Sequence, residues 1–351
     1  MANRWSRRGD EALAQRLVHP LLLAAGLLLV AQPLGRLAAG AALLRVPAAL
    51  ETPSAPPAPA AGSPPAVPAG PAPAAPAPGP PEPLTGGDVL DGFPDWSPDG
   101  TQIVFMRDGR TWVMAADGSS ARPLAAGRDT WDTQPSWSPD GRWIALIRHP
   151  QDGKSDHGQL VRMRADGTGE QVLVEAGEPL GYLAWHPGGE GIAFTTRGRL
   201  VHLDLRTRMT RILAEAGPEG DLLPGGVAWS PDGQWLVFGS GRRHPDRLDL
   251  DLYRVPAAGG EPERLTTGGG IMPHVSPDGR KIAFRSPHRQ SGIHVLDLDS
   301  GQTAVRQPDQ RADLYFHPRW SPDGTRLLAS RLNLRSDARG VHVTSAIVVL
   351  R

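Results

Sequence analysis

The sequence predicts an all-β fold, a six-bladed β-propeller, from three observations. A five-residue pattern occurs six times, an apolar run follows each copy, and a segment before the first copy resembles the strand that the last repeat lacks. The copies begin at Trp96, Trp137, Trp185, Trp229, Val275 and Trp320, and four of them read WSPDG. Successive copies begin 41, 48, 44, 46 and 45 residues apart. That period is typical of a propeller with one four-stranded blade per repeat.

Each copy of the pattern lies between the first and second predicted strands of its blade. An apolar run such as IVF (103–105) or WLVF (235–238) follows shortly after the final glycine. β-Branched and aromatic runs bounded by turns indicate strands that are buried on both faces. A third strand follows, as in TWVM (111–114), and then a fourth, as in RPLAAG (122–127). The repeat therefore accounts for a whole blade.

The sixth repeat ends after its third strand, AIVVL (346–350). A candidate for its fourth strand lies at the start of the repeats, because PLTGG (83–87) resembles the fourth-strand segment RLTTGG (264–269). We expect this N-terminal strand to complete the C-terminal blade. Such closure pairs strand edges that would otherwise invite aggregation.

The pattern itself suits a tight turn better than a reactive loop. Pro98 fits the second position of a type I turn, Asp99 the third, and Gly100 the left-handed position that ends it. WHPGG (185–189) keeps the proline and the last glycine without the aspartate. We therefore interpret the pattern aspartates as turn residues and expect the pattern tryptophans to pack between blades.

These residues also resemble a known family. P-x-WSPDG, an apolar strand, a third strand and LT-x-G are similar to the TolB-type propeller repeat, also called the WD40-like or PD40 repeat, over residues 84–351. The resemblance implies an exported domain for protein–protein interaction. TolB-type proteins carry a small α/β domain before the propeller, where this chain has a proline-rich tract. Related propellers precede a hydrolase domain, but the chain has no G-x-S-x-G nucleophile elbow.

The first 83 residues predict a tether. Residues 1–16 form a short basic tail, and residues 17–35 carry no charge over 19 positions, a length that matches a hydrocarbon core of about 30 Å. Arginines before this span place the N-terminus in the cytoplasm and the propeller in the periplasm or outside the cell. We expect a single-pass signal-anchor helix. The alternative is a cleaved signal peptide with the apolar core 21–31.

Residues 36–83 are predicted to be a disordered linker rich in proline and alanine. The part from 47 to 83 has 15 prolines in 37 residues, and proline fixes φ and removes backbone donors. Such a segment forms no core and samples polyproline II. It serves as a spacer that holds the propeller away from the membrane.

Charge and cysteine content exclude several kinds of site. Lys+Arg and Asp+Glu are both 37, so no basic field is available for nucleic acid. The chain has no cysteine, which excludes disulfides, thiolate metal sites and a cysteine nucleophile. We predict no cofactor and no metal.

Candidate ligand-binding residues lie where the first strand of each blade begins, at the mouth of the central channel. Counting back one to five residues from each pattern gives the unrepeated polar side chains Asp91, Asp95, Asp132, Gln134, Tyr182, His274, Tyr315, His317 and Arg319. Loops and strand ends on a rigid scaffold commonly carry recognition.

The leading hypothesis is a membrane-tethered, extracytoplasmic module that binds a protein, peptide or envelope polymer and catalyses nothing. The alternative is an exported lyase or hydrolase, in which His274 and His317 converge with Arg319 as a metal or acid–base site. That arrangement would loosely resemble the histidine-lined centre of propeller lyases that act on acidic sugars. Convergence of both imidazoles with a carboxylate would favour the alternative.

Overall fold

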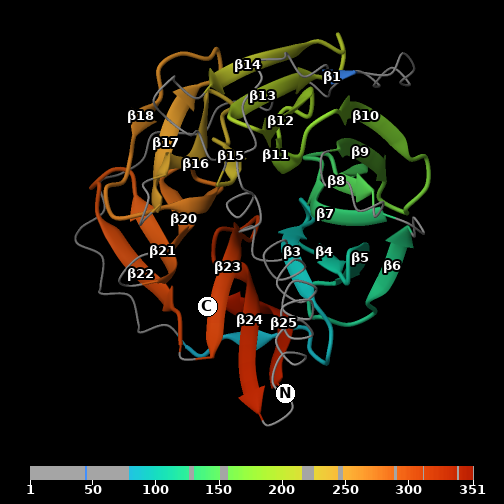
Figure 1. Ribbon diagram of the computed structural model, residues 1–351, viewed down its shortest axis with the longest axis vertical. Helices are drawn as coiled ribbons and strands as arrows, with labels where there is room; N and C mark the ends of the chain where they lie inside the picture. Colours follow the sequence, from blue (N-terminus) through green and yellow to red (C-terminus); the bar gives the residue numbers. More distant parts are fainter. Residues whose placement is uncertain are drawn as a thin grey trace, which may run out of the picture.

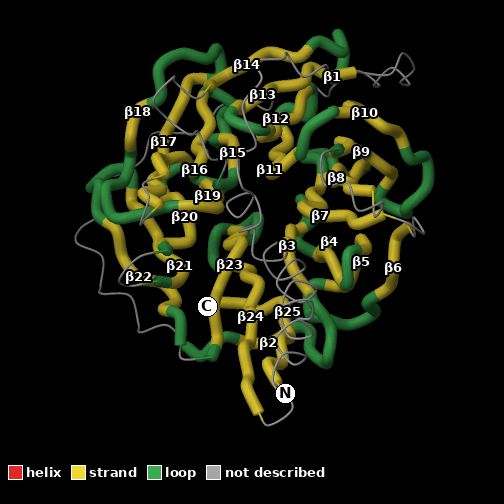
Figure 2. The backbone as a smooth tube through the Cα atoms, viewed as in Figure 1, coloured by secondary structure: helices red, strands yellow, loops and turns green. Residues whose placement is uncertain are grey.

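The computed structural model describes residues 44–45, 79–125, 130–150, 157–215, 225–243, 248–287, 291–310, 312–337 and 340–350. These residues form strands and loops, without a helix in that part of the chain (Figure 2). None of the described residues form a helix long and apolar enough to span a membrane. The signal-anchor helix predicted at 17–35 and most of the linker predicted at 36–83 lie outside the described residues.

Six antiparallel sheets surround a central axis, which confirms the predicted six-bladed propeller (Figure 1). Blade 1 contains β3 (Asp91–Trp96), β4 (Gln102–Arg107), β5 (Arg110–Ala115) and β6 (Arg122–Ala125). Blade 2 contains β7 (Thr130–Trp137), β8 (Trp143–Pro150), β9 (Gly158–Arg164) and β10 (Gln171–Ala176). Blade 3 contains β11 (Leu180–Trp185), β12 (Gly191–Thr196), β13 (Arg199–Asp204) and β14 (Thr210–Glu215).

The other three blades repeat this order. Blade 4 contains β15 (Val227–Trp229), β16 (Trp235–Arg243), β17 (Leu248–Pro256) and β18 (Glu263–Arg264). Blade 5 contains β19 (Ile271–Val275), β20 (Lys281–Ser286), β21 (Gly292–Asp297) and β22 (Thr303–Pro308). Blade 6 contains β23 (Asp313–Trp320), β24 (Leu327–Asp337) and β25 (Gly340–Leu350). A short strand, β1 (Leu44–Arg45), pairs with β10 at the outer edge of blade 2.

The N-terminal strand closes the ring, as predicted. β2 (Glu82–Pro83) pairs antiparallel with β25 and supplies the fourth strand of blade 6. It begins one residue before the predicted segment, and the contact continues past its end, where Thr85 Oγ1 accepts a hydrogen bond of 2.9 Å from Ile347 N–H. The two ends of the propeller are therefore held in one sheet.

The core lies between neighbouring blades. The second strands are buried on both faces, as Ile103, Phe105 and Phe194 show with no exposed surface. Trp96 packs against Leu328 and Ile347 of blade 6, so the first pattern tryptophan joins the first and last blades. This confirms that the pattern tryptophans pack between blades.

First strands lie innermost and contact one another in a closed ring, β3–β7–β11–β15–β19–β23–β3. We call the end at which they begin the mouth face; it also carries the turns between second and third strands, such as Asp108–Gly109. The opposite end carries the five-residue patterns, and we call it the turn face. Every first strand therefore runs from the mouth face to a repeated turn.

Candidate functional site

The register of the first strand shifts in five of the six blades. In four of them the β-bulge lies at the residue pair three and two positions before the pattern. Phe93-Pro94 lies opposite the single residue Phe105, because the register passes from Gly92↔Met106 to Asp95↔Val104. The same bulge occurs at Gln134-Pro135, Met272-Pro273 and His317-Pro318. Proline has no N–H for the ladder, so an interior proline marks such a bulge.

The first residue of each bulge has a left-handed backbone. The φ angles of Phe93, Gln134, Met272 and His317 lie between 52° and 56°, a region that is costly for residues other than glycine. In blade 4 the equivalent residue is Gly226, with φ 110°, and in blade 3 it is Tyr182. Since the strain repeats around the ring, we attribute it to the inner-strand geometry that turns these side chains towards the axis.

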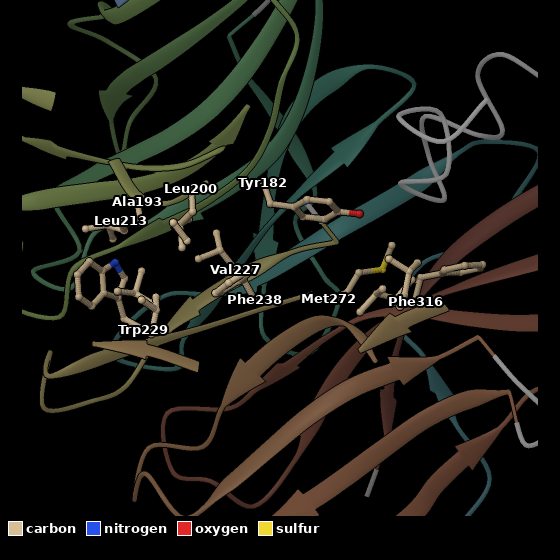
Figure 3. Packing of buried hydrophobic residues seen from close by; sticks show 14 of the residues in the cluster. Tyr182, Ala193, Leu200, Leu213, Val227, Trp229, Phe238, Met272 and Phe316 are labelled. Atoms are coloured by element: carbon tan, nitrogen blue, oxygen red, sulfur yellow. The ribbon is translucent and has the colours of Figure 1, made fainter. Parts of the chain in front are cut away.

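These bulge residues, at mid-height in their strands, are buried. Phe93, Gln134, Tyr182, Met272 and His317 are only 1–6% exposed. The rings of Phe93 and His317, from blades 1 and 6, lie 4.1 Å apart between centroids. Figure 3 shows the Tyr182 hydroxyl pointing away from Leu200 and Val227, towards the side where Met272 and Phe316 lie. The predicted residues Gln134, Tyr182 and His317 therefore lie within the channel, below its mouth.

Two predicted site residues are used for ion pairs within their own blades. Asp91 accepts hydrogen bonds of 2.7 and 2.8 Å from the Arg107 guanidinium. Asp132 accepts bonds of 2.8 and 3.2 Å from Arg148. Each pair joins the beginning of a first strand to the end of the second strand. Both carboxylates are buried and bidentately paired, so they stabilise their blades and are already occupied by protein donors.

Tyr315 does not line the channel. Its side chain packs with Ala283, Ile293 and Leu327 between blades 5 and 6, and the residue is 1% exposed. Its N–H donates to Asp309 Oδ1 at 2.9 Å, and its carbonyl accepts a hydrogen bond from Arg285. Side chains on a strand alternate between faces. Counting back from the pattern therefore identified the position of Tyr315 along its strand but not the face to which its side chain points.

The residue immediately before the pattern forms a second layer near the axis, with Asp95, His274 and Arg319 as its charged or titratable members. Asp95 Oδ2 accepts hydrogen bonds from Ser136 Oγ at 2.8 Å and from Trp137 N–H at 3.0 Å. Arg319 Nε lies 3.8 Å from Asp95 Oδ1, longer than a hydrogen bond, and the two side chains are 14% and 15% exposed. Arg319 also donates to the Pro318 carbonyl at 3.2 Å.

In both channel histidines, Nδ1 makes a hydrogen bond within the protein. His274 Nδ1 accepts a hydrogen bond of 3.0 Å from the Trp320 backbone N–H of the next blade. His317 Nδ1 lies 3.2 Å from Ser330 Oγ, and that hydroxyl accepts from Phe93 N–H. His317 Nε2 and the Tyr182 hydroxyl are buried without a hydrogen-bond partner among the described residues.

Burial keeps the two imidazoles neutral. It lowers the pKa of both His274 and His317 well below 6.5, and the charge of Arg319 lowers both further. Burial also raises the pKa of the Tyr182 hydroxyl, against the opposing effect of Arg319. Burial raises the pKa of Asp95 in spite of Arg319, Ser136 and Trp137. The charge of Arg319 thus acts on all four groups, and Asp95 lies 3.8 Å from its Nε.

The geometry offers no ready metal site in this cluster. Among the described residues, no group of three His, Cys, Asp or Glu side chains is placed to hold a metal ion. A carboxylate that meets both imidazoles was the arrangement that would have favoured the enzyme hypothesis. Asp95 instead bonds to Ser136 and Trp137, and among the described residues no carboxylate is hydrogen-bonded to either imidazole.

Sequence reasoning missed Phe93 and Met272, which share the bulge position with Gln134, Tyr182 and His317. It also missed Ser136 and Ser330, which hold Asp95 and His317. A residue followed by proline, three positions before the pattern, was the available signal. Aligning this residue–proline pair over the four blades that contain it identifies the bulge position in every blade.

The pattern aspartates are turn residues, as predicted. Asp99 Oδ1 accepts hydrogen bonds from Ser97 Oγ at 2.6 Å and from Thr101 N–H at 3.0 Å. The same two bonds recur at Asp140, Asp232, Asp278 and Asp323. The last glycine has φ between 69° and 79° in all six copies. At 185–189, His186 Nδ1 takes over the side-chain contact with Gly188 N–H.

Comparison with known proteins agrees with this architecture. The family model described as the TolB beta propeller domain matches residues 144–344. An uncharacterized protein of Agrobacterium fabrum is 27% identical over 251 residues, which cover 66% of this chain and 81% of that protein.

Two solved structures share the fold with a TM-score of 0.56. One is assigned as TolB from Agrobacterium tumefaciens (20% identity, 76% of this chain, 92% of that chain). The other is an oligogalacturonate lyase in complex with manganese (16% identity, 76% of this chain, 78% of that chain). At these identities the likeness is one of fold alone.

Proposed function

The chain belongs to the TolB beta propeller domain family, and we propose that it is a non-catalytic binding module for a protein, peptide or envelope polymer. The proposal places the ligand at the mouth face, above the ring of bulge residues. The propeller supplies a rigid ring there, and the unrepeated side chains of the first strands supply the specificity.

One observation carries the proposal: the channel combines buried groups that lack partners with catalytic candidates that are already engaged. The Tyr182 hydroxyl and His317 Nε2 have no partner among the described residues, whereas Asp91, Asp95 and Asp132 accept bonds from protein groups. A general base must reach the proton that it removes. Among the described residues, no channel carboxylate is hydrogen-bonded to a channel imidazole, so the cluster favours recognition over proton transfer.

The proposal includes a tether outside the cytoplasm. The uncharged span 17–35 acts as a signal anchor, and the proline-rich segment that follows acts as a spacer. The basic residues of the tail support an orientation with the N-terminus in the cytoplasm. A ring-shaped module on such a spacer searches the envelope for its ligand without leaving the membrane.

Site-specific photocrosslinking in the full-length chain tests which face binds. A crosslinking residue at Asp108 or Arg197, both exposed in turns of the mouth face, should form defined adducts in envelope membranes. The same residue at Thr101 or Gln234, both exposed on the turn face, is the matched control. Equal adducts from both faces, or adducts from the turn face alone, would contradict the proposal.

The enzyme alternative predicts a different outcome. Incubation of the full-length chain with polygalacturonate, with and without manganese, would release unsaturated oligosaccharides if the chain were a lyase. We expect no release in either case. Release that disappears in a His274→Asn variant would replace the binding proposal with the lyase.

A further inference from the structure

The hydrogen bonds of the channel histidines determine which ring nitrogen carries the proton. The Trp320 backbone N–H can only donate, so His274 Nδ1 must be an unprotonated acceptor. The neutral ring then carries its proton on Nε2. Ser330 Oγ accepts from Phe93 N–H, and among the described residues its own proton has His317 Nδ1 as acceptor. We therefore assign the proton of neutral His317 to Nε2 as well, because this assignment gives the Ser330 hydroxyl proton an acceptor.

The same centre holds two further donors. Tyr182, 4% exposed, has a hydroxyl without a partner among the described residues, and burial raises the pKa of that hydroxyl, so it stays protonated. The Arg319 guanidinium has five N–H donors but, among the described residues, makes one hydrogen bond, to the Pro318 carbonyl. Blades 3, 5 and 6 thus direct hydrogen-bond donors to a region around one positive charge.

Acceptors are scarce in this region. Asp95 is the carboxylate next to Arg319, and two of its lone pairs are taken by Ser136 and Trp137. Asp95 Oδ1 lies 3.8 Å from Arg319 Nε, so it lies beside the guanidinium without a hydrogen bond to it. Buried donors without acceptors cost free energy, which a ligand that brings oxygen lone pairs would recover.

We propose that the centre of the channel binds a carboxylate group, held by Arg319, by the Tyr182 hydroxyl and by Nε2–H of His317 and His274. A carboxylate has about four lone-pair sites and accepts from a guanidinium through two oxygens. It therefore matches the donors in number and in charge. The inference rests on the proposed binding function and names the chemistry that the channel recognises.

The neighbours of the donors favour the carboxylate end of an extended peptide over a sugar acid. Phe93 and Met272, both less than 5% exposed, lie in the same ring as Tyr182 and His317. Phe316 and Met272 belong to the apolar cluster that also contains Tyr182 (Figure 3). A narrow, partly apolar ring suits a single chain with an apolar last side chain, whereas a sugar ring would need partners for its several hydroxyls.

Calorimetric titration of the full-length chain tests the proposal with defined probes. N-Acetyl-leucine carries the free carboxylate, and N-acetyl-leucinamide has the same shape without the charge. We expect the acid to bind at least about tenfold more tightly, because hydrogen bonds to a charged acceptor are stronger than those to a neutral one. D-Galacturonate and D-galactose form the second pair. A preference for galacturonate over N-acetyl-leucine would overturn the assignment to a peptide end.

Two variants connect binding to the named residues. Tyr182→Phe removes a hydroxyl that has no partner among the described residues, so the fold should keep its melting temperature while the affinity for N-acetyl-leucine falls several-fold. Arg319→Gln should weaken the acid about tenfold or more and leave the amide unchanged. Arg280→Gln, which removes a guanidinium that is 70% exposed on the turn face, is the matched control and should bind like the parent.

Equal binding of acid and amide would overturn the proposal, as would unchanged affinity for the acid in both Tyr182→Phe and Arg319→Gln. The outcome is separable from that of the proposed function. Selective carboxylate binding together with equal crosslinking from both faces would keep the carboxylate site and reject binding at the mouth face. Crosslinking from the mouth face alone, with equal binding of acid and amide, would keep binding at the mouth face and reject the carboxylate site.

Discussion

The two ends of each first strand differ in how their polar side chains are hydrogen-bonded. At the turn face, serine and aspartate recur in five blades and satisfy one another and the backbone, as Ser97 and Asp99 do. Towards the channel, equivalent positions carry different residues in different blades. In the described part of the chain, the Tyr182 hydroxyl and His317 Nε2 have no hydrogen-bond partner, and at the turn face the same is true of indole nitrogens of pattern tryptophans such as Trp96. The repeated end therefore stabilises the ring, and the unrepeated end is free to recognise a ligand.

This contrast shows why a reactive-looking motif was the wrong place to seek function. A hydroxyl beside a carboxylate suggests chemistry, but here both are used to close a hairpin in five of the six blades. Function is better sought where symmetry fails, because a ring of identical turns has no means of orienting an asymmetric ligand. Three measurements would break or sharpen the comparison.

The largest expected effect comes from the turn end. Trp137 is 7% exposed and packs against Val104 and Val113 of the preceding blade. Trp137→Ala should lower the free energy of unfolding by about 3–5 kcal/mol, since it opens a cavity between two blades. Urea denaturation of the full-length chain measures the change. Trp143→Ala, at a half-buried tryptophan, is the control and should cost clearly less; equal losses would show that the pattern end has no special structural role.

The channel end should govern stability in mild acid. His274 and His317 have a folded pKa well below 6.5, so stability is complete above that pH and falls below it, where the unfolded chain binds protons that the folded chain does not. The maximal slope is about 1.4 kcal/mol per pH unit for each such imidazole. Burial lowers the pKa of His149 and His202 too, so they add to the loss.

A single variant separates the channel from these other groups. His274→Asn keeps an acceptor for Trp320 N–H and removes the titration, so its stability should fall less steeply between pH 6.5 and 5. His157→Asn, at an exposed position, should follow the parent curve. The turn aspartates behave in the opposite way: hydrogen bonds lower the pKa of Asp232, so its contribution is present above about pH 4 and is lost only in stronger acid. Parallel curves for His274→Asn and the parent would show that the channel imidazole is not buried as described.

The smallest expected effect tests one turn. Ser230 Oγ accepts from Trp235 N–H at 3.1 Å and donates to Asp232 at 2.6 Å. Ser230→Ala leaves that N–H without its partner and should lower the free energy of unfolding by about 1–2 kcal/mol. Thermal unfolding followed by circular dichroism measures it. Ser300→Ala, in an exposed turn, should change little because water replaces the hydroxyl; a similar loss in both variants would argue against a special role for the repeated serine.

The candidate site was only partly predictable. Counting back from the pattern found Asp95, Tyr182, His274, His317 and Arg319, and the charge of Arg319 acts on the other four. It also selected Asp91 and Asp132, which are paired with arginines of the adjacent strand, and Tyr315, which is buried between blades. Each of these depends on a side-chain direction that the bulge changes, and a bulge shifts the alternation of faces beyond it.

The sequence by itself determined the number of blades, the turn that joins the first two strands of each, and the strand that closes the ring. These features follow from local rules that repeat every 41–48 residues, so six copies reinforce one interpretation. The tertiary structure alone decided which polar groups converge on the axis and which of their atoms are left without partners. Such convergence joins blades that are distant in sequence, and it exists only once closure has fixed the distance of every first strand from the axis.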